Sequence, residues 1–309
     1  MSARRAAWAL ALLIALGCAH RAVSDGTGLV AQPSASPSGA ERAAVAESRT
    51  TETPVTAAPW PLEKAPTART AWCTESVSAL DEETCYVVPP SPTRTLLVYF
   101  HGIVPPEQDS EENGTLQRII AKSAQKAGIV ALVPRGKQGL APRGRERWWG
   151  WPTNQASYSA HGAAIVAAVL EKRKQLERLL GVSFVRTYVA GSSSGAYFVT
   201  RLALQGGLDA DGFGAMSGGS VPDAIDLDRI VKRPFYIGYG QFDPARSTAH
   251  TLAGLLRGAG WSVREARHPF GHGARAVYIE EALAFFRAEE SGPSPPNEMG
   301  GGASTTPER

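Results

Sequence analysis

Short apolar segments alternate with longer helical patterns through the middle of this chain, and that alternation restricts its fold more than any other feature. The apolar segments are rich in valine, isoleucine and aromatic residues, as strands buried in a sheet are. Between them, apolar residues recur at a helical period, and two of these patterns stop at a glycine. This order predicts an α/β fold, a mostly parallel sheet covered by helices on both faces.

The predicted elements form a single domain, residues 68–290, because 43% of the residues are hydrophobic, which is enough for one sizeable core. Strands are expected at residues 84–88, 95–100, 129–133, 184–190, 213–216, 235–239 and 263–267. Helices are expected at residues 116–127, 163–180, 196–205, 245–258 and 274–288. The segments 18–67 and 291–309 are poor in large apolar residues, so we expect both to be disordered.

Residues 1–17 have the pattern of a signal peptide, with two arginines before an apolar run that is too short to cross a bilayer. The run ends in Ala-Leu-Gly-Cys at residues 15–18, which resembles the bacterial lipobox, where the cysteine carries lipid. We therefore expect a lipid anchor at Cys18, a tether behind it and a location in the bacterial cell envelope. The alternative is a secretory signal that is cut near Ala19.

The charge of the chain argues against a nucleic-acid partner. The formal net charge is +3, and removal of the two arginines in the signal peptide leaves 3 − 2 = +1 for the mature protein. A near-neutral protein lacks the positive charge that binds a phosphate backbone. We expect contact with a membrane only through the lipid.

The chain has three cysteines, an awkward number in an oxidising compartment unless one is used elsewhere. Lipid on Cys18 leaves Cys73 and Cys85, whose disulfide would close an N-terminal hairpin. Their spacing matches neither a zinc site nor a Cys-x-x-Cys redox pair. The alternative is two free, partly buried thiols in a reducing cytosol.

Residues 191–195 read Gly-Ser-Ser-Ser-Gly and lie between a predicted strand and a predicted helix. Gly-x-Ser-x-Gly in that setting is typical of a nucleophile elbow, a turn so tight that its flanks require glycine. The middle residue, Ser193, is therefore the candidate nucleophile. The alternative is a serine- and glycine-rich loop without a catalytic role.

A serine hydroxyl is a weak nucleophile, so the site needs a base and an acidic group that orients the base. In an elbow fold these groups follow the serine in the order acid, then histidine. The favoured acid is Asp243, on the loop after the strand expected at residues 235–239. The alternatives, which follow the preceding strand, are Asp223, Asp226 and Asp228.

Two histidines compete for the role of the base after the last predicted strand. His272 lies between two glycines, which let its loop curl back over the edge of the sheet. His268 ends the strand and precedes a rigid proline. We favour His272 because its loop can bring the ring within reach of the serine.

An oxyanion hole needs backbone N–H groups beside the nucleophile. The N–H of Ser194, the residue after the nucleophile, is one candidate. The second follows the apolar strand that ends in His101-Gly102-Ile103, a turn that would place the N–H of Ile103 near the serine. We expect the His101 side chain to hold this turn, and we count it among the residues that could line the substrate pocket.

The fragments YFHG, GSSSG, GQFDPA and GHG, in this order and spacing, resemble the α/β-hydrolase superfamily over residues 95–287. The PRG that precedes WWGW resembles the secreted polyhydroxyalkanoate depolymerase and feruloyl esterase-like branch. The resemblance implies Ser193 as nucleophile, Asp243 as acid and His272 as base, with backbone donors at Ile103 and Ser194. The HGIV sequence departs from the family because it lacks the longer glycine run of many lipases.

The segment 134–151 gathers arginines and tryptophans on a loop that follows a strand, so it should lie on the same edge of the sheet as Ser193. Arg143, Arg145, Trp148 and Trp149 could bind a carboxylate, an aromatic acyl group or a sugar. The alternative is that the tryptophans pack the loop onto the sheet while the arginines stay in solvent.

These observations favour a serine hydrolase that cleaves small or polymeric carboxylic esters through an acyl-enzyme intermediate, without metal or organic cofactor. A peptidase or amidase of the same fold is one alternative. A non-catalytic envelope lipoprotein that binds a ligand in the pocket is another, although the chain has a candidate for every catalytic role.

Overall fold

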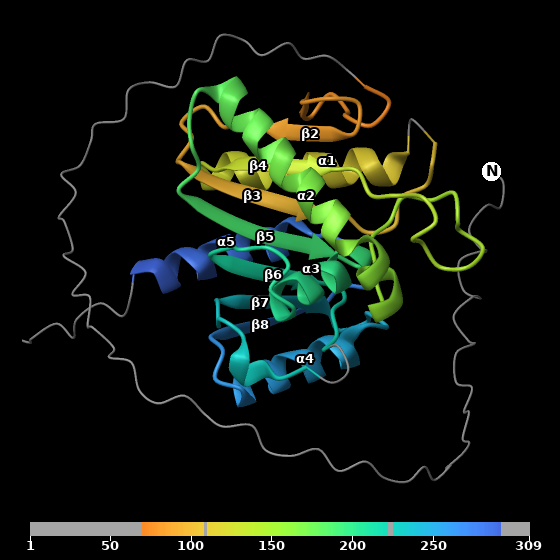
Figure 1. Ribbon diagram of the computed structural model, residues 1–309, viewed down its shortest axis with the longest axis vertical. Helices are drawn as coiled ribbons and strands as arrows, with labels where there is room; N and C mark the ends of the chain where they lie inside the picture. The colour runs from red at the N-terminus through yellow and green to blue at the C-terminus, as the bar shows by residue number, and fades with distance from the viewer. Residues whose placement is uncertain (1–69, 108–109, 222–224, 292–309) are drawn as a thin grey trace, which may run out of the picture. The chain divides into compact units, whose positions relative to one another are not determined.

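The computed structural model describes residues 70–107, 110–221 and 225–291 (Figure 1). The expected signal peptide, Cys18, the tether and the tail after Ser291 lie outside these ranges. Among the helices of the described ranges, none combines the length and the apolar character that a membrane crossing requires.

Within the described residues, eight strands form one sheet in the order β1-β2-β4-β3-β5-β6-β7-β8 (Figure 1). The strands are β1 (Ser78–Ala79), β2 (Thr84–Val87), β3 (Thr95–Phe100), β4 (Val130–Pro134), β5 (Arg186–Ser192), β6 (Gly212–Met216), β7 (Phe235–Gly240) and β8 (Val263–His268). Only the pairs β1–β2 and β2–β4 are antiparallel; the other neighbours run parallel. This is the mostly parallel α/β fold predicted from the sequence.

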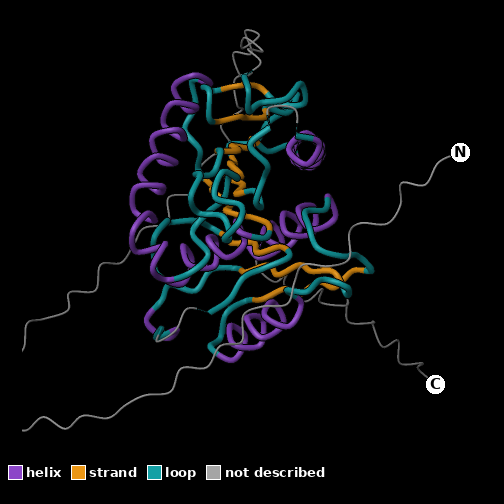
Figure 2. Tube along the Cα trace, turned by 90° about the vertical axis from the view of Figure 1, so that its right-hand side faces the viewer, coloured by secondary structure: helices purple, strands orange, loops and turns teal. Residues whose placement is uncertain are grey.

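Helices cover both faces of the sheet, as the edge-on view of Figure 2 shows. They are α1 (Glu111–Ala127), α2 (Gln155–Leu180), α3 (Ser194–Leu204), α4 (Arg246–Gly258), α5 (Ala276–Ser291) and the short 3₁₀ helix η1 (Leu227–Arg229). One face carries α1 and α5, which contact each other, and the other face carries α2, α3 and α4 (Figure 1). Because strands β3 to β8 are parallel, their carboxyl ends meet at one edge, where the loops that follow them gather.

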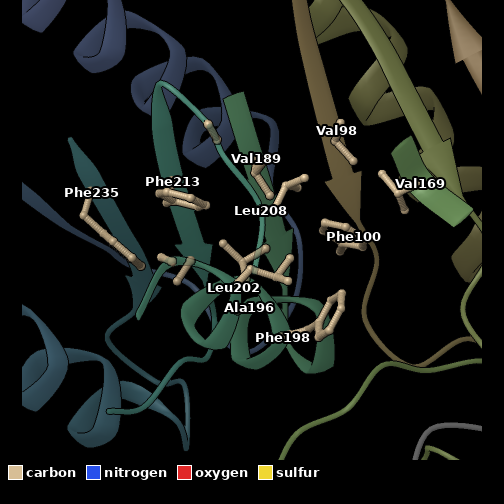
Figure 3. Close-up of a cluster of buried hydrophobic side chains, with 14 of the residues drawn as sticks. Val98, Phe100, Val169, Val189, Ala196, Phe198, Leu202, Leu208, Phe213 and Phe235 are labelled. Carbon is tan, nitrogen blue, oxygen red and sulfur yellow. The ribbon is translucent and has the colours of Figure 1, made fainter. Parts of the chain in front are cut away.

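Each face of the sheet has its own apolar core, one under α1 and α5 and the other under α2, α3 and α4. Figure 3 shows part of the second core, in which Phe198 of α3 packs edge-on against Phe100 at the end of β3, with ring centroids 5.1 Å apart. Trp151 packs against the same ring at 4.8 Å. Full burial of an aromatic side chain stabilises a fold by about 2 to 3 kcal/mol, so this cluster fixes α3 on the sheet.

Several boundaries differ from the sequence prediction, among them the starts of α1, at Glu111 rather than 116, and of α2. Helix α2 begins at Gln155 rather than at residue 163, because Asn154 and Ser157 form a reciprocal capping box at a polar, alanine-rich start that lacks an apolar period. Strand β5 covers Arg186–Ser192 rather than residues 184–190, because its pairing continues to Gly191 with β3 and to Ser192 with β6. The helices expected to stop at Gly128 and Gly181 do so, and the backbone of both glycines has the left-handed conformation.

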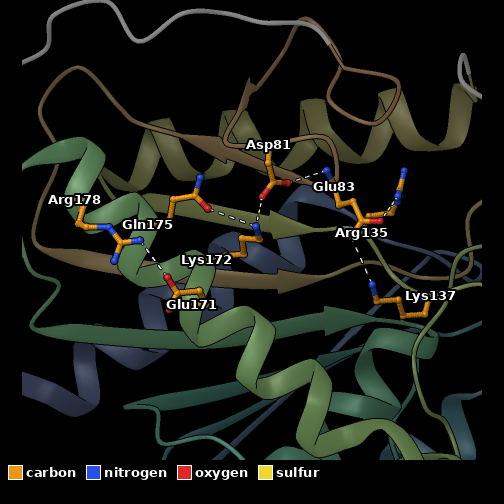
Figure 4. Close-up of polar contacts among 8 residues, drawn as sticks. All are labelled: Asp81, Glu83, Arg135, Lys137, Glu171, Lys172, Gln175 and Arg178. Carbon is orange, nitrogen blue, oxygen red and sulfur yellow. Dashed lines mark hydrogen bonds and ion pairs between the residues drawn. The ribbon is translucent and has the colours of Figure 1, made fainter.

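The disulfide expected between Cys73 and Cys85 is present, and both residues are buried. It joins the N-terminal segment to β2, beside the hairpin of β1 and β2. The turn of this hairpin carries Asp81 and Glu83, which form ion pairs with Lys172 of α2 and with Arg135 (Figure 4). The hairpin is thereby fixed both to α2 and to the loop that follows β4.

Candidate active site

Ser193 lies in a sharp turn between β5 and α3, with φ 52° and ψ −117°. This is a strained conformation for a residue with a side chain, and the turn is held by a 2.9 Å hydrogen bond from Ser193 N–H to the carbonyl of Met216. A Cβ at Gly191 would stand 2.7 Å from the carbonyl oxygen of Phe100, and one at Gly195 only 2.1 Å from it. Both flanking positions therefore require glycine, as the elbow motif predicts.

The side chains of Ser193, His272 and Asp243 form one hydrogen-bonded line. Nε2 of His272 is 2.9 Å from the Ser193 hydroxyl, and Nδ1 is 2.9 Å from Oδ1 of Asp243. An ionised carboxylate can only accept, so Nδ1 carries the proton and Nε2 is free to accept the serine proton. The His272 side chain is 41% exposed while that of Asp243 is fully buried, so a substrate can reach one end of the line and water cannot reach the other.

Asp243 lies on the loop after β7, directly before α4. Burial works against its ionisation, but hydrogen bonds from His272 and from the backbone N–H of Ala245, the latter 2.8 Å long, outweigh it and hold the pKa of the carboxyl below its ordinary value. The group is therefore a carboxylate at neutral pH. A buried carboxylate on Nδ1 keeps the imidazole in one tautomer and stabilises the imidazolium that forms when Nε2 takes a proton.

The alternative acids and the alternative base lie elsewhere in the structure. His268 is 3.2 Å from Glu281 and packs against the rings of Phe270 and Tyr278. Asp226 and Asp228 are exposed around η1, and Asp223 lies outside the described residues. Of the candidates within the described ranges, the structure brings Asp243 and His272 to Ser193.

The turn after β3 lies against the nucleophile, because a Cβ at Gly102 would meet the Cβ of Ser193 at 3.2 Å. The N–H of Ile103, the next residue, has no acceptor within the described residues. Ser194 is the first residue of α3, and the first N–H groups of a helix have no partner within it. Both backbone groups are thus free to donate, and their role in an oxyanion hole stays a prediction.

His101 is fully buried, so it cannot line a substrate pocket, and that part of the sequence prediction is wrong. Its Nε2 accepts a 2.8 Å hydrogen bond from Gly136 N–H, and its Nδ1 donates to the Gly102 carbonyl. The rings of Trp72 and Trp151 pack against it, with centroids 5.0 and 5.2 Å away. Burial lowers the pKa of His101 to about 4, so the ring is neutral and holds the turn beside Ser193.

The arginine- and tryptophan-rich loop lies next to this turn, because Trp149 pairs with Val104 in an antiparallel bridge. Trp151 is buried in the core, whereas the half-buried Trp148 and Trp149 lie under the guanidinium groups of Arg145 and Arg135, at 4.6 and 4.1 Å. The tryptophans therefore pack the loop, as one of the two sequence interpretations expected.

The positive charges of this loop fall into two groups. Arg135 and Lys137 form ion pairs with Glu83, so their charge is compensated (Figure 4). Arg143 and Arg145 are exposed, and no carboxylate within the described residues forms an ion pair with either. Together with Arg147, which is also exposed and forms no ion pair within the described residues, these guanidinium groups are available to a ligand.

Ser217, which was not predicted as a site residue, directly follows β6 and lies next to the elbow. Its side chain is fully buried and contacts the loop that carries His272, through Gly273. A serine followed by two glycines at the carboxyl end of a strand was the available signal. No group of three or more His, Cys, Asp or Glu side chains suited to a metal ion gathers within the described ranges.

No protein-family model matches the chain, and no curated protein matches it by sequence. Among solved structures, it is similar to a carboxylesterase from Mesorhizobium loti, with 19% identity, 68% of this chain and 94% of that chain covered, and a TM-score of 0.49. It is also similar to the Bacillus cereus carboxylesterase, with 15% identity, 66% and 93% covered and a TM-score of 0.48. An esterase named PE8 matches with 18% identity, 66% and 96% covered and a TM-score of 0.48. At these values the likeness carries no weight for the chemistry at Ser193.

Proposed function

We propose that this protein is a serine hydrolase that cleaves carboxylic esters through an acyl-enzyme intermediate. The observation that carries the proposal is the hydrogen-bonded line from Ser193 through His272 to the buried Asp243. A strained serine, a base within reach and a buried carboxylate that orients the base are the parts that activate a hydroxyl for attack.

In the first half of the reaction, the Ser193 oxygen attacks the ester carbonyl carbon while Nε2 of His272 takes the hydroxyl proton. The carbonyl oxygen becomes an oxyanion, which the N–H groups of Ile103 and Ser194 would stabilise; one such donor lowers the barrier by about 3 kcal/mol. When the tetrahedral intermediate collapses, the bond to the alcohol oxygen breaks and His272 returns the proton to it. In the second half, His272 takes a proton from a water molecule, whose oxygen attacks the acyl carbonyl carbon. The bond to the Ser193 oxygen then breaks, the proton returns to that oxygen and the acid leaves.

A ligand-binding lipoprotein without catalysis is the less favoured alternative, because ligand binding does not require the proton path from Ser193 to Asp243. The ester is favoured over the amide because an alcohol leaves without the stronger protonation that an amine requires. Small, feruloyl and polymeric hydroxyalkanoate esters remain the candidate substrates, in keeping with the resemblance of the loop at residues 134–151.

The test is hydrolysis of p-nitrophenyl esters of increasing chain length, with feruloyl and hydroxybutyrate esters and matched amides, together with labelling by a fluorophosphonate. We expect ester turnover and one label, at Ser193. Ser193→Ala should lose both, whereas Ser192→Ala, which removes the neighbouring hydroxyl, should keep substantial activity. Ester turnover by Ser193→Ala at the rate of the wild-type protein would contradict the proposal.

We further propose that the protein acts in the bacterial cell envelope, held by lipid on Cys18. The buried disulfide between Cys73 and Cys85 supports an oxidising compartment. Cys18→Ser should abolish incorporation of a palmitate analogue and release the protein from the membrane fraction. Continued incorporation in that variant, or secretion of unmodified wild-type protein, would contradict this location.

A further inference from the structure

We propose that Ser217 is a positioning residue that keeps the loop of His272 at hydrogen-bond distance from Ser193; this inference rests on the proposed function. The Ser217 hydroxyl donates to the carbonyl of Gly273 at 3.0 Å and accepts the N–H of the same residue at 3.3 Å. Gly273 directly follows His272. One side chain at the end of β6 thus binds both backbone groups of the residue next to the candidate base.

The backbone of Ser217 indicates that this contact is built into the fold. Within the described residues, only Ser193 and Ser217 have a positive φ without being glycine, at 52° and 51°. A strained serine persists only where its surroundings hold it, and such residues gather at functional sites. The Ser217 N–H donates to the Gly238 carbonyl at 2.8 Å, which ties this turn to β7.

The same turn also contacts the elbow. A Cβ at Gly218 would stand 2.9 Å from the carbonyl oxygen of Ser193, and the Met216 carbonyl accepts the Ser193 N–H. Residues 216–218 therefore touch the nucleophile on one side and the loop of the base on the other. A shift of this turn would change the distance between Ser193 and His272.

One backbone contact anchors the loop on each side of His272, whose ring also binds Asp243. Before the histidine, the Phe270 carbonyl accepts the N–H of Phe242 at 3.0 Å. After it, Ser217 binds Gly273, whose φ of 126° favours glycine. The exposed ring of His272 lies between these two anchors, and loss of the second one would let the ring move away from the serine. A displacement of about 1 Å in a reacting group can cost about 100-fold in rate.

The test compares Ser217→Gly, which removes the hydroxyl and also relieves the positive φ, with Ser217→Ala, which removes only the hydroxyl. Ser123→Ala in α1 is the matched control, because it also removes a fully buried hydroxyl. We expect both Ser217 variants to lose roughly 10- to 100-fold in kcat with little change in KM. Hydrogen exchange over residues 269–275 should become faster in both, and the Ser123 variant should match the wild-type protein in each measurement.

A double-mutant cycle separates positioning from general damage. In a His272→Ala background, Ser217→Gly should change the residual rate by no more than about twofold, because its effect passes through the histidine. The inference is overturned if Ser217→Gly keeps the wild-type kcat, if exchange over residues 269–275 does not change, or if the full loss persists in the His272→Ala background. If the wild-type protein neither hydrolyses an ester nor reacts with a fluorophosphonate, the proposed function itself fails and this role falls with it.

Discussion

A Cβ atom at Gly195 would stand 2.1 Å from the carbonyl oxygen of Phe100, where α3 begins beside the end of β3. The obstacle is backbone at the centre of the sheet, so it cannot move aside as a flexible side chain would. Gly195 and Phe100 leave no space for a side chain between them. This close approach determines the position of Ser193.

Gly195→Ala should therefore destabilise the protein by about 3 kcal/mol and remove fluorophosphonate labelling. The matched control is Gly254→Ala in α4, where an added Cβ meets nothing within 4 Å. That variant should gain about 0.5 to 1 kcal/mol, because alanine favours a helix over glycine. Urea denaturation measures both changes, and equal midpoints for the two variants would contradict the steric account.

His272→Ala should lower kcat by roughly 10⁴-fold, because the Ser193 hydroxyl loses its proton acceptor. His268→Ala removes the same side chain four positions earlier, where it contacts Glu281 instead of the nucleophile. It should stay within about tenfold of the wild-type rate. Assay of both variants on one ester decides between the two histidines, and a loss confined to His268→Ala would reverse the assignment.

Removal of the disulfide by the double substitution Cys73→Ser and Cys85→Ser should lower the free energy of unfolding by about 3 kcal/mol, because the unfolded chain gains loop entropy. Denaturant titrations with and without a reducing agent measure the effect on the wild-type protein. The free energy of unfolding of the double variant should not change when the reducing agent is added. A wild-type protein that is equally insensitive would show that the bond does not form.

Charge reversal at Arg143 and Arg145 should raise KM for esters that carry a carboxylate, because their exposed guanidinium groups are not compensated. The KM for p-nitrophenyl acetate should hardly change. Charge reversal at Arg118 of α1, an arginine away from this loop, serves as the control. Equal effects on anionic and neutral esters would mean that the loop has only a packing role.

The buried His101 makes stability depend on pH in a defined direction. Its pKa is lowered from 6.5 to about 4 in the folded protein, so between these values the unfolded chain binds a proton that the folded protein does not. The free energy of unfolding should therefore fall by about 3 kcal/mol as the pH drops from about 6.5 to about 4.

Urea titrations at several pH values measure this slope. His101→Asn should be less stable at neutral pH but should lose the slope over that window, whereas His161→Asn, at an exposed position on α2, should keep it. Asp81 and Asp243, whose pKa values are lowered from 3.8, lose their contribution mostly below this window, and Glu83 and Glu265, lowered from 4.5, add to the slope only at its acidic end. An unchanged slope in His101→Asn would contradict the assignment.

Much of the fold follows from local patterns in the sequence. Apolar runs predicted every long strand, and the glycines at 128 and 181 predicted where two helices stop. Ser193 could be predicted because its tight turn requires glycines on both sides, and residues 191–195 show that pattern within five consecutive positions. The early start of α2 was missed, although its capping pair, Asn154 and Ser157, is also a local signal.

The rest of the site was decided by tertiary packing. His268 and His272 differ by four positions along the chain, yet one faces Glu281 and the other faces Ser193, 79 residues away in sequence. The hydrogen bonds of His101 with Gly136 and of Ser217 with Gly273 likewise join residues on loops that follow different strands. Such distances depend on how the sheet and helices pack, because directional hydrogen bonds form only where the buried core has already brought the backbone into place.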